Sequence, residues 1–171
     1  MKLKTPLFVW GVCLALFVLS VFVLGASLPE RVATHFGASG QADGWMSRSK
    51  HMIAFSLFGV GFSGFVIGIC YVIRFLPPTV LNVPRPDYWR SPEHFREACE
   101  FMFRHSFWFG AMTSAWLAVL HYLLVQANRK PVPALDAKAV WGLTLAFLAG
   151  TAVWVLSMVR FLARTGRTES A

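Results

Sequence analysis

The chain has 171 residues, a length that fits a single domain covering 1–171. Hydrophobic residues make up 56% of it and charged residues only 14%, whereas a soluble globular domain has about a quarter charged residues. These proportions exclude an ordinary water-soluble domain. The net charge of +8 does not indicate a nucleic-acid partner, because the charges flank long apolar stretches.

Four apolar stretches predict transmembrane helices at 6–26, 53–76, 106–126 and 139–162. A helix of about twenty residues, rising about 1.5 Å per residue, matches the roughly 30 Å hydrocarbon core of a bilayer. The central parts of the stretches contain no Asp, Glu, Lys or Arg, whose charges are costly in hydrocarbon. Because lipid cannot pair backbone N–H and C=O groups, we expect an all-α integral membrane protein, a four-transmembrane-helix bundle.

The first stretch also resembles a secretory signal sequence, since Lys2 and Lys4 precede it and small residues follow it. Its apolar run from Leu7 to Leu24 is longer than the roughly 7–15 residues of a signal peptide. We therefore expect a retained membrane helix.

The first connection, 27–50, predicts a short amphipathic helix at the membrane interface. Ser27 and Glu30 have the spacing of a capping box, with Pro29 in the first turn, and Gly37 is suited to end the helix. The face of this helix toward the membrane would comprise Leu28, Val32, His35 and Phe36. Turn residues follow, and Trp45 is expected to be an interfacial anchor.

The second connection, 76–105, divides into a proline-rich part and a helical part. The prolines of 77–86 predict an extended segment. Ser91, Pro92 and Glu93 then have the order typical of a helix start. We expect a second amphipathic helix there, on the cytoplasmic surface and running into the third span. Its apolar face would comprise Phe95, Ala98, Cys99 and Met102.

The distribution of basic residues predicts the orientation. With four spans, both termini and the 76–105 connection share one side, which carries ten Lys and Arg against six on the other. The positive-inside rule then places the N- and C-termini in the cytoplasm. The basic cytoplasmic face is also suited to anionic lipid.

Small residues recur at four-residue spacing in every span, as in Gly64 and Gly68 or Gly142, Ala146 and Gly150. Such faces allow helices to approach closely. They fit packing within one chain and also a homo-oligomer.

No catalytic, metal or cofactor motif is present in the sequence. The five histidines lack the spacing of a metal site, and Cys13, Cys70 and Cys99 form no CxxC pair. No phosphate-binding glycine motif and no nucleophile elbow occur. We therefore expect a protein that is not an enzyme, without cofactor, metal or nucleic acid, whose partner is the lipid bilayer.

The first connection carries a pattern of spaced residues, LPxxVxxHFxxxGxxDxWxxxSK, from Leu28 to Lys50. It resembles the uncharacterised bacterial membrane domain at the N-terminus of SdpI-type immunity proteins. A second signature of that family resembles the cytoplasmic connection here, at Asn82, Pro84, Asp87, Tyr88 and Trp89. The chain departs from the family at Ala33, often proline there, and we do not expect it to contain the additional helices of the immunity proteins.

The resemblance implies a protein of the bacterial cytoplasmic (inner) membrane. Our leading hypothesis is a non-catalytic protein that senses or binds an envelope-active peptide or toxin on its outer face. His35, Phe36, Asp43 and Trp45 are the predicted ligand-binding residues. The alternatives are a small transporter subunit or permease helper, with Thr113, Ser114, Thr144 and Thr151 facing a cavity, and a structural protein whose loop signature serves folding.

Overall fold

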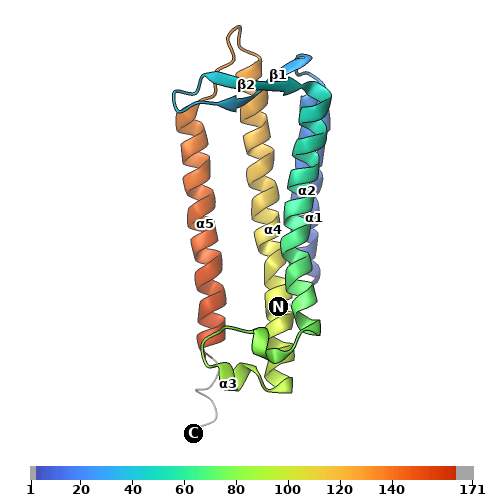
Figure 1. The fold of residues 1–171 in the computed structure, drawn as a ribbon, viewed down its shortest axis with the longest axis vertical. Coiled ribbons are helices and arrows are strands. Elements are labelled where there is room, and N and C mark those ends of the chain that lie inside the picture. The colour runs from blue at the N-terminus through green and yellow to red at the C-terminus, as the bar shows by residue number, and fades with distance from the viewer. Residues whose placement is uncertain (1–2, 165–171) are drawn as a thin grey trace.

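The computed structural model describes residues 3–164 and consists mainly of four long helices with a β-hairpin across one end (Figure 1). The four helices are long and apolar enough to cross a membrane, in agreement with a multi-pass membrane protein. The helices are α1 Lys4–Leu19, continued by the π-helical turn Ser20–Leu24; α2 Arg48–Val72, continued by the 3-10 turn Ile73–Phe75; α4 Pro92–Asn128; and α5 Ala137–Arg164. The start of α1 and the end of α5 lie away from the hairpin (Figure 1).

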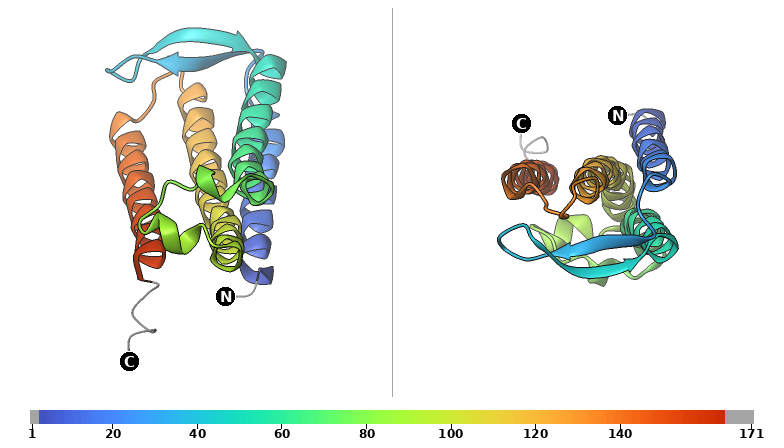
Figure 2. Two further views of the ribbon diagram at one scale, coloured as in Figure 1. Left: turned by 60° about the horizontal axis from the view of Figure 1, so that its bottom comes forward. Right: turned by 90° about the horizontal axis from the view of Figure 1, so that it is seen from above.

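Helix α4 is the central element. It packs against α1 and α2 on one side and against α5 on another, as the view from above shows (Figure 2). Within the described chain, no residue of the most apolar window of α5 is buried, whereas the corresponding window of α4 is the most buried of the four. Helix α5 is therefore a peripheral helix that leaves much of its surface to the surrounding solvent or lipid.

Only some of the small residues lie where helices meet. A Cβ added to Gly110 would come within 2.9 Å of the Trp10 ring, and one added to Gly150 within 2.6 Å of the Met112 sulfur. These glycines permit close contacts of α4 with α1 and α5. In contrast, a Cβ at Gly64, Gly68 or Gly142 would meet nothing within 4 Å.

The first connection is not helical, and this part of the all-α expectation is wrong. It forms an antiparallel hairpin of β1 Arg31–Phe36 and β2 Ala42–Ser47. Gly37 does not end a helix but opens the turn, where its N–H donates to the Gln41 carbonyl. Gly40 completes the turn with a φ of +81°, a conformation that favours glycine.

The spacing of Ser27 and Glu30 predicted a helix start, and a local contact explains why no helix begins there. The Ser27 hydroxyl donates to the carbonyl of Leu24, so it terminates the preceding helix instead of capping a new one. The Glu30 carbonyl accepts from the N–H of Arg48, the first residue of α2. The Ser27 hydroxyl is therefore used by a contact that the four-residue pattern does not contain.

The second connection folds back on the bundle. Pro78 and Pro86 each occupy the first turn of a short helix, the 3-10 turn Pro78–Val80 and α3 Pro86–Trp89, so the proline-rich part is not wholly extended. Helix α4 begins at Pro92 and continues without a break through the third span. The apolar face that we expected on the membrane surface is buried against Leu81, Trp89 and Leu162.

Candidate functional site

The hairpin is attached to the end of α4 through one buried side chain. The Asn128 amide oxygen accepts from the Ala33 N–H at 2.8 Å, and its NH₂ group donates to the carbonyls of Ala33 and Leu124 at 3.0 Å each. Beside it, Leu28 and Val32 are buried against the last turns of α4. Because Asn128 uses both its oxygen and its nitrogen, it fixes the position of β1 above the helices.

The hairpin has two further attachments. At its turn, Leu135 donates its N–H to the Gly40 carbonyl at 2.8 Å, and a Cβ at Gly40 would lie 2.6 Å from the Leu135 oxygen. At its base, the Arg48 guanidinium donates to the carbonyls of Ala26 and Leu28. The hairpin is thus held at both ends and in the middle, so it is a rigid platform rather than a free loop.

His35 and Asp43, two of the predicted ligand-binding residues, are joined by a side-chain hydrogen bond between His35 Nδ1 and an Asp43 carboxylate oxygen. Each strand has a bulge here, since neither Thr34 nor Asp43 has a partner in the register. Gly44 lies opposite His35, and a Cβ on it would be only 2.8 Å from the His35 Cβ. The side chains of His35 and Asp43 are 76% and 53% exposed, so the pair is available to a ligand.

Trp45 lies on the outer strand, with its side chain 44% exposed and the Arg31 guanidinium 5.2 Å from its ring centroid. Its register partner is Ala33. Since the N–H and C=O of Ala33 both face Asn128, this pair is not hydrogen bonded, and the N–H and C=O of Trp45 point to the opposite edge of the hairpin. Within residues 3–164, no hydrogen bond to this outer edge at Trp45 is found.

Phe36 faces a different direction. It lines a small pocket of about 210 Å³ between the hairpin turn and the start of α5, together with Leu135, Val140 and Trp141. The structure therefore brings His35 and Asp43 into contact and keeps Trp45 on the same short hairpin. It separates Phe36 from them and places it against α5.

The second signature, which includes Asn82, Pro84, Asp87, Tyr88 and Trp89, lies at the opposite end of the molecule. Trp89 is buried, and its indole N–H donates to the Leu162 carbonyl at 2.8 Å, which ties α3 to the end of α5. Tyr88 stacks on the His94 ring with centroids 3.7 Å apart. Asn82, Pro84 and Asp87 are exposed. Trp89 therefore has a structural role, whereas the side chains of Asn82, Pro84 and Asp87 are not buried.

The structure brings together two buried histidines whose contact was not predicted from the sequence. His51 in the first turn of α2 and His121 in α4 are 3% and 0% exposed, and their rings stack at 5.5 Å. In the described part of the chain, His51 Nε2 and both ring nitrogens of His121 have no hydrogen-bond partner. Thr113 and Ser114, also buried on α4, have unpartnered hydroxyls. The 70-residue separation of the two histidines left no local signal for their contact between α2 and α4.

One family model matches a part of the chain that includes the hairpin. Residues 11–60 match the family described as Domain of unknown function (DUF1648). The match contains most of α1, the whole hairpin and the first half of α2, but not the Trp89 region. No curated protein and no solved structure matched the chain.

Proposed function

We propose that this chain is a non-catalytic protein of the bacterial inner membrane that binds an envelope-active peptide or toxin through its hairpin. The proposal places the hairpin outside and both termini in the cytoplasm, following the charge bias of the connections. An immunity-like role, in which the protein intercepts a membrane-active peptide, is the form of this function that the resemblance to SdpI-type proteins suggests.

The observation that supports binding is the division of the hairpin into an anchored edge and an open edge. β1 is bonded to Asn128, whereas the Trp45 N–H and C=O on β2 point outward. An extended peptide can add to such an edge by main-chain hydrogen bonds. The side chains of Trp45, His35 and Asp43 would then select among peptide sequences, because they are exposed on the same hairpin.

Substitution at Trp45 separates main-chain pairing from side-chain contact. Trp45→Pro removes the outward N–H without removing a bond between β1 and β2, whereas Trp45→Thr removes the indole and keeps the N–H. Cells that express each variant would be challenged with a panel of amphipathic envelope-active peptides, and survival would be measured. Binding of the same peptides to the protein in nanodiscs would be measured in parallel.

We expect the wild-type chain to protect against at least one peptide and Trp45→Thr to protect partly. Trp45→Pro should lose both protection and binding. If Trp45→Pro protected as well as the wild-type chain, edge pairing would be wrong, and the exposed side chains alone would have to carry recognition.

A second candidate function, a small transporter subunit, is favoured by the buried, stacked pair of His51 and His121, whose ring nitrogens are in part without partners in the described chain. Ionisable residues within a span mark substrate or ion pathways more often than inert packing. If protons or cations pass along the His51–His121 pair, His121→Phe should abolish pH- or cation-dependent flux into proteoliposomes. The same variant should leave the hairpin phenotype unchanged. Equal flux in both proteins would eliminate this candidate.

A further inference from the structure

Basic side chains gather at the base of the hairpin, where its strands meet the ends of α1, α2 and α4. Three of them lie around Ser47. Arg31 is opposite Ser47 in the strand register, Arg48 follows it in the chain, and the Lys50 N–H lies 3.4 Å from its hydroxyl oxygen. These three cations come from β1 and from the first turn of α2.

A fourth cation reaches the same place from the end of α4. The Arg129 guanidinium donates to the Ser27 hydroxyl at 3.3 Å. Ser27 lies in the chain between Ala26 and Leu28, whose carbonyls accept from the Arg48 guanidinium. We refer to Arg31, Arg48, Lys50 and Arg129 as the basic cluster.

The contacts within the basic cluster orient its side chains without neutralising their charge. Arg31 lies over the Trp45 ring, and Arg48 and Arg129 donate to carbonyl and hydroxyl oxygens. Within residues 3–164, no ion pair between an acid and a member of the cluster is found. Along the chain, Glu30 is the one acid next to a cluster residue, and the first turn of α2 contains no acid.

This surplus of positive charge is unfavourable in the isolated chain. Like charges at one place repel each other, and Arg48 and Lys50 also occupy the end of α2 at which the backbone dipole disfavours cations. Arg31, Lys50 and Arg129 are exposed, so an anion from outside the chain can reach them. Such an anion would offset the repulsion.

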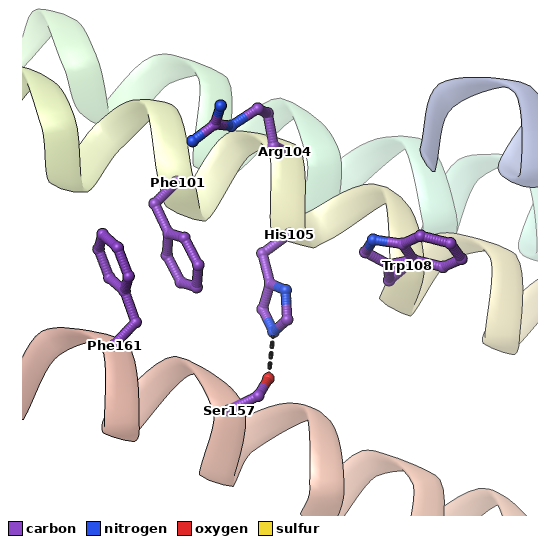
Figure 3. A pocket seen from close by; sticks show the side chains of 6 residues that line it. All are labelled: Phe101, Arg104, His105, Trp108, Ser157 and Phe161. Atoms are coloured by element: carbon purple, nitrogen blue, oxygen red, sulfur yellow. Dashed lines mark hydrogen bonds between the residues drawn. The ribbon is translucent and has the colours of Figure 1, made fainter. Parts of the chain in front are cut away.

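The opposite end of the molecule differs in this respect. A pocket of about 530 Å³ lies there between α4 and α5, and the side chains of His105 and Ser157 are hydrogen bonded at 2.8 Å between the two helices (Figure 3). Arg104 lines this pocket, and Glu100 lies one turn before it on α4. That end thus has an acid on the same helix as its cation, whereas the first turn of α2 has none.

The depth of the basic cluster matches the headgroup layer of a bilayer. The charge-free run of α2 begins at Ile53, so Lys50 and Arg48 lie about 4.5 and 7.5 Å before it along the helix. The headgroup layer extends roughly 5–7 Å beyond the hydrocarbon core on each side. Trp45, against which Arg31 packs, is of a residue type enriched at this depth.

We propose that the basic cluster binds the headgroup of an anionic phospholipid in the leaflet at the hairpin end. Arg31, Arg48 and Lys50 contact the phosphate oxygens, which guanidinium groups bind in a bidentate manner. An anionic headgroup is favoured over a zwitterionic one because its net charge offsets the surplus of cations. The bound lipid joins the base of the hairpin to the bilayer. This assignment does not depend on peptide binding or on which side of the membrane the hairpin faces.

Native mass spectrometry of the full chain in detergent micelles tests this assignment. The lipids are phosphatidylglycerol and phosphatidylcholine with identical acyl chains, and glycerol phosphate serves as a headgroup without a chain. We expect the wild-type chain to retain phosphatidylglycerol in preference to phosphatidylcholine. The double variant Arg31→Gln, Lys50→Gln should lower this preference at least about tenfold, since each basic residue near an anionic surface contributes about fivefold. Arg31→Lys with Lys50→Arg keeps both charges and should keep most of the preference.

Lys138→Gln with Arg160→Gln is the matched control, since it removes the same charge at exposed positions outside the cluster. It should keep the preference of the wild-type chain. Equal retention of both lipids by the wild-type chain, or an equal loss of preference in the control, would overturn the proposal. Glycerol phosphate retained as tightly as phosphatidylglycerol would also overturn it, because the cluster would then be a site for free anions.

Peptide binding in phosphatidylcholine nanodiscs separates this proposal from the peptide-binding function. If the cluster recognised acidic residues of a peptide instead, the double glutamine variant would lose peptide binding and keep its lipid preference, and the lipid assignment would fall. Loss of the lipid preference with peptide binding intact supports it. Should the double variant fail to fold, Arg31→Gln and Lys50→Gln made singly should each lower the preference about fivefold.

Discussion

At the scale of single residues, the hairpin signature contains two kinds of residue. Leu28, Val32 and Gly40 are buried and position the hairpin. His35 and Asp43 contact each other but remain exposed. The buried residues fit the alternative that the signature serves folding. The exposed pair fits the hypothesis that the signature binds a ligand. One spaced pattern therefore contains residues with separable roles, which single substitutions can distinguish.

Asn128 should be the most important polar residue for the hairpin. Asn128→Ala removes three hydrogen bonds and leaves the buried N–H and C=O of Ala33 without partners. We expect a loss of about 2–3 kcal/mol in stability, measured by thermal unfolding in detergent micelles. Asn82→Ala, at an exposed position, is the control and should be close to neutral. A melt of Asn128→Ala equal to that of the wild-type chain would show that the hairpin does not depend on this contact.

Two glycines provide a matched pair. Gly40→Ala would strain a residue at φ +81° and push a Cβ toward the Leu135 carbonyl, so we expect a lower melting temperature. Gly68→Ala adds a methyl where nothing lies within 4 Å, in the last turns of α2. It should leave the melt unchanged or raise it slightly, because alanine favours a helix over glycine. The reverse order of the two melting temperatures would contradict this account of the turn.

At the scale of elements, the hairpin shows how strand and helix patterns compete within a few residues. From the sequence we expected a helical face that includes His35 and Phe36. The same segment contains Val32 and Thr34, whose branched side chains favour strands. The glycines of the turn, Gly37 and Gly40, were the other available signal for a hairpin. The strand conformation prevails because β2 and Asn128 supply partners for β1 that an isolated helix would lack.

The triple variant His35→Ala, Asp43→Ala, Trp45→Ala tests whether the exposed face serves folding. The exposed contact of His35 with Asp43 contributes at most about 1 kcal/mol, and Trp45 is half exposed, so we expect a change of only a few degrees in the melt. The same variant should lose peptide binding. A drop of many degrees would instead favour the structural alternative, and the binding proposal would lose its main support.

At the scale of the whole molecule, the hairpin and the Trp89 region attach to opposite ends of the central helix α4. Asn128 holds β1 at the end of α4, and Trp89 packs on the first turns of α4 while bonding to Leu162 of α5. Between these ends, α5 contacts α4 without being buried. Each end thus connects segments that are far apart in the sequence.

The proposed orientation, with the hairpin outside, rests on the charge bias alone and is open to a direct test. Ser39 is exposed in the hairpin turn, and Thr79 is exposed at the opposite end of the molecule. In intact spheroplasts, Ser39→Cys should react with a membrane-impermeant maleimide, whereas Thr79→Cys should react only after permeabilisation. The wild-type chain, with its own three cysteines, provides the background. The opposite labelling pattern would invert the topology and place the hairpin in the cytoplasm.

The amino-acid sequence by itself determined the four membrane-spanning helices. A span is a local property, since each helix needs only its own run of apolar residues to be stable in hydrocarbon. The tertiary structure decided the hairpin, the contact of His35 with Asp43, the stacking of His51 on His121 and the pocket between α4 and α5. These features depend on partners distant in the chain, as Asn128 and Ala33 are 95 residues apart, and no local pattern encodes such a contact.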